Sequence, residues 1–221
     1  MNRLAASFSL ALLAAPAALA FDPAAMTQLT TTLRCFDCDL TDADLTGLDL
    51  VGVYLTNVDL QGATLAGADL TNGYLRFGRL NDADFTGTNL TNTNLESANL
   101  ANSNLAGAIL VDASFINTTA GNAIFDGATM TGANLSRTNG RGASFKGADL
   151  TDANLAGAVL NNADFTGAVL RGATIDRSIF SGANLTEADL TGATVTGTSF
   201  ANAVLCRTIM PDGTTSNANC P

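Results

Sequence analysis

The chain contains no histidine among its 221 residues, and this absence excludes several classes of site. Ser-His-Asp and Cys-His catalysis, histidine-based zinc sites and the haem-attachment motif all require that residue. No EF-hand or glycine-aspartate nonapeptide pattern is present either. We therefore expect a protein that is not an enzyme, with no cofactor and no bound metal.

The first twenty residues differ in composition from the rest. Arg3 precedes an apolar run over residues 4–15, and small residues lead up to Ala20. This is the pattern of a secretory signal peptide that is cleaved after Ala20. The run is short for a membrane span, and no stop-transfer pattern follows it. The sequence thus predicts a signal peptide over 1–20 and a mature protein that is periplasmic or secreted.

Cations are scarce in the remainder. The whole chain has 10 Lys and Arg against 20 Asp and Glu, and loss of Arg3 leaves 9 cations and a net charge of −11. An acidic protein of this kind repels phosphate groups and anionic lipids. We expect no nucleic-acid partner and no membrane insertion.

A five-residue repeat fills most of the chain. From Leu40 to Leu205 there are 34 consecutive pentads, and 32 of them have Leu, Phe, Met, Ile or Val at the central position, the multiple of five. Ala stands two residues earlier in 21 pentads, and Gly, Asn or Asp two residues later in 28. Neither the helix period of 3.6 nor the strand period of 2 maintains such a pattern. The pentad itself is therefore the structural unit, one short extended side followed by one corner.

The motif Ala-[Asp/Asn]-[Leu/Phe] recurs at 68–70, 98–100, 148–150 and 163–165. In these residues the chain resembles the pentapeptide-repeat family. The resemblance implies an all-β solenoid, a right-handed quadrilateral β-helix with four pentads per coil and about 8.5 coils. Residues twenty apart would then be stacked neighbours on adjacent coils.

The ends of such a solenoid must be covered, because each coil is buried only by the next. Asp22 followed by Pro23 is typical of a helix start. We expect a short capping helix within 21–34, the β-helix over 35–205 and a C-terminal cap over 206–221.

The four cysteines lie near the two ends of the repeat region. In an oxidising compartment an even number of cysteines indicates disulfides. The ends of the rod would lie far apart, and Cα atoms separated by more than about 7 Å are not bridged. We expect Cys35 to pair with Cys38 and Cys206 with Cys220. Cys35 and Cys38 also have the spacing of a redox pair, but the βαβ context of that chemistry is missing.

Two central positions, Ala120 and Gly140, lack a large side chain, and their spacing of twenty stacks them on one face. An unfilled gap of that size would be costly in a protein core. We expect larger neighbours, among them Phe125 and Phe145, to fill it.

Cations gather near this gap. Lys146 is expected to pair with Asp126 one coil away, whereas Arg137 and Arg141 have no acid at that spacing and Arg177 lies two coils from Arg137. These three arginines form a candidate anion site. The alternative is that they are ordinary unpaired surface arginines.

Tyr54 and Tyr74 are twenty apart at an outward position, with Phe77 nearby. Exposed aromatic residues of this kind are common in binding interfaces. We take these three residues as a candidate partner surface, with a purely stabilising ladder as the alternative. Val159 and Ile179 form a second outward apolar step.

Acids concentrate in the early coils, where seven aspartates lie between Asp37 and Asp69 without a cation. We expect a solvated acidic face there.

Two functions remain open. The first is a non-enzymatic exported scaffold or binding surface for an unknown protein partner, of uncertain oligomeric state. The second, implied by the family resemblance, is an acidic DNA-mimicking inhibitor of a DNA topoisomerase that confers quinolone resistance. An aspartate stripe is interrupted at Asn89, Ile109 and Thr129, where a mimic needs continuous charge.

Overall fold

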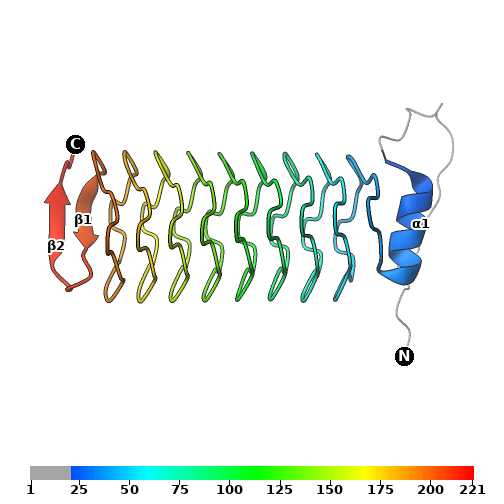
Figure 1. Cartoon of the computed structure of the whole chain (residues 1–221), viewed down its shortest axis with the longest axis horizontal. Coiled ribbons are helices and arrows are strands. Elements are labelled where there is room, and N and C mark those ends of the chain that lie inside the picture. Colours follow the sequence, from blue (N-terminus) through cyan, green and yellow to red (C-terminus); the bar gives the residue numbers. More distant parts are fainter. Residues whose placement is uncertain (1–20) are drawn as a thin grey trace.

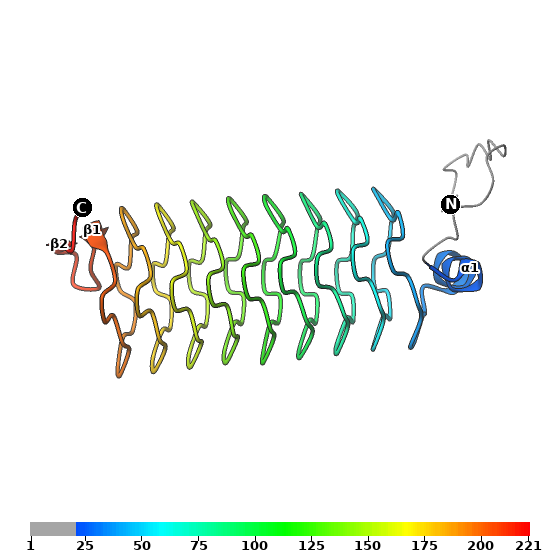
Figure 2. The same ribbon diagram turned by 90° about the horizontal axis from the view of Figure 1, so that it is seen from above.

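The computed structural model describes residues 21–221, so the predicted signal peptide lies outside the described residues. The chain forms a long rod of stacked coils (Figure 1). Helix α1 (Pro23–Thr32) lies at one end, and a hairpin of strands β1 (Leu205–Ile209) and β2 (Thr215–Ala218) lies at the other. A view from above, turned by 90° about the horizontal axis, shows the same order (Figure 2). Within residues 21–221, no helix is both long and apolar enough to span a membrane.

Each pentad contributes one bridging residue to the rod. That residue pairs in parallel with the residue twenty positions later, as Asn94 does with Ser114 and Ser114 with Asn134. The backbone bonds on either side of each bridge span 19 or 21 residues, and the N–H of Leu100 donates to the carbonyl of Thr119 at 2.7 Å. Four pentads therefore complete one coil, which confirms the predicted β-solenoid.

The corners explain the small and polar residues of the repeat. The residue two after each central position has a positive φ, for example 64° at Gly107 and 60° at Asn102. Glycine adopts this conformation freely, and Asn and Asp adopt it more readily than other residues. The backbone thus accounts for the prevalence of Gly, Asn and Asp at this position.

The core is a set of files that run along the rod. Leu60, Leu80 and Leu100 are fully buried one above another, as the twenty-residue spacing predicts. Phe125 and Phe145 stack in another file, with ring centroids 4.8 Å apart. Burial of each such side chain contributes roughly 1.5–3 kcal/mol, so stability accumulates coil by coil.

The gap at Ala120 and Gly140 is filled. A Cβ atom placed on Gly140 would lie 3.0 Å from Cδ2 of Leu160, the central residue of the next coil. Beside it, the Thr138 hydroxyl donates to the carbonyl of Phe115 at 2.7 Å. Leu160, which the sequence did not single out, therefore occupies the space that a larger side chain at position 140 would need.

Helix α1 begins as its sequence predicts. The side chain of Asp22 caps it by accepting from the N–H of Ala24 at 2.8 Å, and Pro23 is the first helical residue. Ala25 and Leu29 are buried against the first coil. The helix ends at Thr32, and its C-cap residue Leu33 is in the left-handed conformation.

At the far end the solenoid and the hairpin share strand β1. Ile209 bridges Asp189 on the preceding coil, and it also pairs with Thr215 of β2. Coil-type bonding continues to Pro211, whose carbonyl accepts from Gly192 at 2.9 Å. The solenoid pairing therefore extends past the expected boundary at residue 205, because β1 is bonded on both of its edges.

Candidate partner surfaces and the family of the chain

The two tyrosines form a stacked ladder on the first coils. The rings of Tyr54 and Tyr74 are 4.7 Å apart and inclined by only 6°. The guanidinium of Arg34 lies 4.8 Å from the centroid of Tyr54 on the preceding coil. Since Tyr54 lies between Arg34 and Tyr74, both faces of its ring are covered, and Tyr54 presents its ring edge to solvent. This geometry suits edge and hydroxyl contacts rather than stacking of a flat ligand.

Phe77 extends this surface from the neighbouring corner. It occupies a turn position with a φ of 61° and is 50% exposed. The guanidinium of Arg76 lies 5.0 Å from its ring centroid, and Arg76 also pairs with Glu96 at 3.2 Å. The ion pair with Glu96 holds the Arg76 side chain in place, and the cation–π contact of Arg76 in turn orders the exposed ring of Phe77.

Three residues of this surface were not recognised from the sequence: Arg34, Phe36 and Arg76. Phe36 is 49% exposed and stands two coils before Arg76 in the same position of the repeat. The sequence nevertheless contained the relevant pattern. Arg34 is twenty residues before Tyr54 and so belongs to the tyrosine column, while Phe36 and Arg76 each follow a residue of that column by two positions. We call the six residues together the aromatic–arginine surface: Arg34, Phe36, Tyr54, Tyr74, Arg76 and Phe77.

Of the three arginines in the predicted anion site, the structure brings two together. Arg137 and Arg177 line one pocket of about 680 Å³ at a corner of the rod. Arg141 is not among the residues that line it, because it follows the next central position and lies at a different corner. The pocket also contains one acid, Asp176.

The lysine near this region pairs differently from the prediction. The Nζ atom of Lys146 lies 3.4 Å from a carboxylate oxygen of Asp164 rather than against Asp126. Asp126 instead accepts from the backbone N–H of Lys146 at 3.1 Å. Arg76 pairs with Glu96 at 3.2 Å and Arg79 with Asp59 at 3.0 Å, each pair joining adjacent coils.

Most of the acidic face is made of turn residues. The aspartate or asparagine before a central residue accepts the N–H two residues later through its Oδ1, as Asp164 does from Thr166 at 3.0 Å. Among residues 21–221, nine aspartates and seven asparagines of the repeat form this turn. Asparagine does so almost as often as aspartate, so the turn selects the oxygen and not the charge.

These hydrogen bonds affect ionisation. The hydroxyl and the N–H of Thr46 lower the pKa of Asp44 below its usual value. At Asp164 burial opposes ionisation, but Thr166 and Lys146 stabilise the carboxylate more strongly, and its pKa is also lowered. Among residues 21–221, no three Cys, Asp or Glu side chains are grouped to hold a metal ion.

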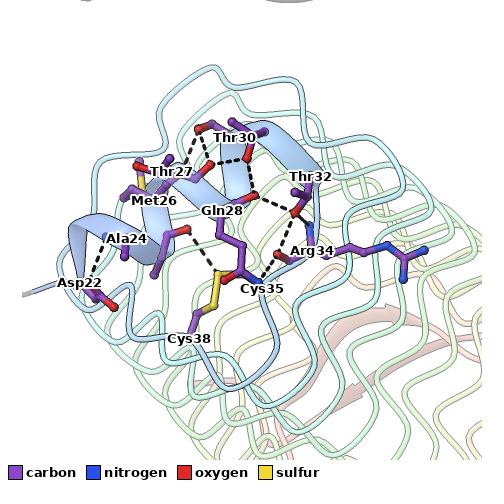
Figure 3. The surroundings of a disulfide bond; sticks show 12 residues. Asp22, Ala24, Met26, Thr27, Gln28, Thr30, Thr32, Arg34, Cys35 and Cys38 are labelled. Carbon is purple, nitrogen blue, oxygen red and sulfur yellow. Dashed lines mark hydrogen bonds between the residues drawn. A yellow bond between two sulfur atoms is a disulfide. The ribbon is translucent and has the colours of Figure 1, made fainter.

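Both cysteine pairs lie at bonding distance. The Cα atoms of Cys35 and Cys38 are 5.4 Å apart, and those of Cys206 and Cys220 are 4.8 Å apart, within the usual range for disulfides. Cys35 is buried under α1, with its Sγ atom 3.5 Å from the carbonyl oxygen of Ala25 (Figure 3). Both cysteines belong to the first coil, since each makes a backbone hydrogen bond to the following coil.

The pentad geometry agrees with a known family model. The pentapeptide-repeat model matches 8 copies, over residues 34–76, 79–115, 108–147, 143–182 and 183–212. The chain belongs to the pentapeptide-repeat family. Its solved relatives imply a right-handed quadrilateral β-helix.

Two solved structures illustrate the likeness. QnrB1, a plasmid-mediated fluoroquinolone resistance protein, is 20% identical with a TM-score of 0.56, and the match covers 72% of this chain and 86% of that one. HetL, a pentapeptide-repeat protein involved in the regulation of heterocyst differentiation in the cyanobacterium Nostoc sp. strain PCC 7120, is 28% identical with a TM-score of 0.48. That match covers 83% of this chain and 91% of HetL. At these values the likeness to QnrB1 concerns the fold alone. No curated protein matches the chain.

Proposed function

We propose that this pentapeptide-repeat protein is an exported, non-enzymatic scaffold that binds another protein through its aromatic–arginine surface. In this proposal the rod has about 8.5 coils, by the count of 34 pentads, and α1 closes its N-terminal end. The observation that carries the proposal is the exposure of three aromatic side chains next to two ordered arginines on the first coils.

The composition and order of this surface support binding. Tyr and Arg are enriched among the residues that dominate the energy of protein interfaces. Phe36, Tyr74 and Phe77 are 49%, 42% and 50% exposed. Stacking and the cation–π contacts already fix several of these side chains, so a partner would lose little conformational freedom in ordering them.

The sequence of residues 1–20 and the cysteines support export. The leader has the pattern of a cleaved signal peptide. Four cysteines at disulfide distance suit an oxidising compartment.

The competing function is a DNA-mimicking inhibitor of a topoisomerase. The fold shared with QnrB1 and the net charge of −10 are the observations in its favour. However, many of the acids serve the turns, and exposed Ile109 interrupts the column of Asp49 and Asp69. These observations support the scaffold over the mimic.

Fractionation of producing cells separates the two functions. The scaffold predicts a mature chain that begins at Phe21 in the periplasm or medium, which intact-mass measurement detects. A cytosolic protein with an intact leader and inhibition of gyrase in vitro would establish the mimic instead.

The binding surface is tested with the mature chain immobilised in a periplasmic extract. The double substitution Tyr54→Ala and Tyr74→Ala should abolish capture of a partner that the wild type retains. Val159→Ala with Ile179→Ala is the matched control, since these residues form another outward apolar step of the same spacing. Equal capture by the tyrosine variant and the control would refute the proposed surface.

A further inference from the structure

The corner pocket around Arg137 and Arg177 is a second site, separate from the aromatic–arginine surface. We propose that it binds a small dicarboxylate, and an acidic amino acid in particular. The two arginines supply the anion contacts, and Asp176, which directly precedes Arg177, receives an ammonium group.

The hollow follows from alternation along one corner of the rod. This column reads Arg137, Gly157, Arg177 and Gly197 at intervals of twenty. A Cβ atom on Gly157 would lie 3.8 Å from Cγ of Arg137, and one on Gly197 would lie 3.6 Å from Cγ of Arg177. Each arginine therefore extends over a glycine of the next coil, and Gly157, which lies between the two arginine coils and has no side chain, lines the pocket.

The backbone does not explain arginine at these corners. Arg137 and Arg177 both have a φ of 58°, at a position where the repeat otherwise prefers Gly, Asn or Asp. Arginine in this left-handed conformation is less favourable than glycine by about 1–2 kcal/mol.

Three other departures from the turn preference, Phe77, Glu187 and Arg207, have a partner inside the protein. Glu187 and Arg207 occupy successive corners and form an ion pair with each other. Phe77 lies under the guanidinium of Arg76. In contrast, Arg137 and Arg177 make no ion pair within residues 21–221. Their charges are thus available to a ligand from outside the chain.

The charges of the pocket define the ligand. The arginines are two coils apart, a separation of roughly 9.6 Å at their Cα atoms at a strand spacing of about 4.8 Å. Guanidinium groups bind carboxylates in a planar, often bidentate geometry. Asp176 already accepts the N–H of Thr196 at 2.7 Å through Oδ1, which fixes its position and leaves Oδ2 for a cation.

The same charges disfavour larger anions. A polyanion would meet Asp176 and the net charge of −10 on the whole chain. The pocket volume of about 680 Å³ lies in the range of small-molecule sites. Two carboxylates and one ammonium group, as in glutamate, complement two arginines and one aspartate.

Titration of the mature protein with L-glutamate, followed by amide chemical shifts, tests the proposal. We expect saturable shifts at residues 136–137, 156–157 and 176–177. Arg137→Asn and Arg177→Asn should each weaken binding about tenfold or more. Asparagine is native to this corner, as at Asn117 with a φ of 58°, so these variants retain the fold.

The control is Arg141→Asn, which removes the same charge outside the pocket and should leave the affinity within about twofold. Glutarate tests the role of the acid, since Asp176→Asn should weaken binding of glutamate but not of glutarate, which has no ammonium group. The proposal is overturned if glutamate causes no saturable shifts, if Arg141→Asn weakens binding as much as Arg137→Asn, or if inorganic phosphate binds as tightly as glutamate.

Discussion

At the scale of single residues, many pentads supply a side chain that accepts a backbone N–H at their own turn. In Asp44-Leu45-Thr46 the Oδ1 atom of Asp44 accepts the N–H of Thr46 at 3.0 Å, while Leu45 turns inward and is buried. One residue thus supplies the core and its two neighbours complete the turn. The motif Ala-[Asp/Asn]-Leu is explained by these contacts without reference to any ligand.

Substitution of Asp44 tests this explanation. Asp44→Ala removes the acceptor and should lower the free energy of unfolding by about 1 kcal/mol. Asp44→Asn keeps the acceptor and should change stability by less than about 0.5 kcal/mol at neutral pH. Urea denaturation followed by circular dichroism measures both. A loss as large for Asn as for Ala would show that the charge matters and not the turn.

Position 140 gives a prediction opposite to the repeat pattern. Gly140→Leu restores the usual central residue, but Leu160 already occupies that space, so we expect a loss of about 1–3 kcal/mol of stability from overpacking. Adding Leu160→Ala should recover part of the loss, as a thermodynamic cycle would show. Stabilisation by Gly140→Leu alone would mean that the gap is empty.

At the scale of elements, the two ends of the rod carry different structures, a helix at one and a hairpin at the other. Helix α1 places Ala25 and Leu29 on the first coil, and Cys35 of that coil lies with its Sγ atom 3.5 Å from the carbonyl oxygen of Ala25 in the helix. At the other end β1 and β2 form a hairpin, so β1 does not remain an open edge.

The two disulfides should differ in their effect on stability. Cys206 and Cys220 are 14 residues apart, and Cys35 and Cys38 only three. The entropy of loop closure predicts that replacing Cys206 and Cys220 by serine costs about 3 kcal/mol of stability. Replacing Cys35 and Cys38 by serine should cost about 2 kcal/mol. Denaturation in guanidinium chloride measures the two losses. If the shorter loop contributes more, its stabilisation comes from native contacts of Cys35 rather than from the unfolded chain.

At the scale of the whole molecule, the sequence predicts what the twenty-residue period alone determines. The tyrosine stack and the buried leucine files follow from position in the repeat. The pairing of Lys146 with Asp164 does not, because the two are 18 apart and the side chain reaches diagonally across adjacent coils. Local packing determines which of two neighbouring acids a long flexible side chain contacts, and the twenty-residue period does not predict that packing.

The sequence also allows a prediction of which corner of the rod carries each of the three arginines. Arg137 and Arg177 follow the central residue by two positions, and Arg141 follows its own by one, so the repeat places them at different corners. The hollow between the first two depends on Gly157 as well as on the arginines. Because this pocket depends on the absence of a side chain at Gly157, it is recognised only when all residues of the Arg137 column are compared at intervals of twenty.

Acid should destabilise the whole rod. Six carboxyl groups have a pKa below the usual value: Asp39, Asp44, Asp82, Asp164, Asp189 and Asp212. A lowered folded-state pKa contributes stability that is fully present above the unfolded value of about 3.9 and is lost as the pH falls through the folded value. We expect the unfolding free energy to be nearly constant above about pH 5 and to fall below about pH 4. Urea midpoints that stay unchanged down to pH 2 would contradict this linkage.

Each surface assigned to this protein depends on one claim, that every twenty residues advance the chain by one coil along a straight rod. Electron–electron resonance distances between spin labels test it directly. Labels at Thr64 and Ser144, and at Thr64 and Asn184, belong to one column four and six coils apart. The native cysteines are all in disulfides and do not compete for the label. The account predicts that the second distance exceeds the first by roughly 10 Å, at about 4.8 Å per coil. Equal distances, or a second distance shorter than the first, would contradict the rod and the surfaces placed on it.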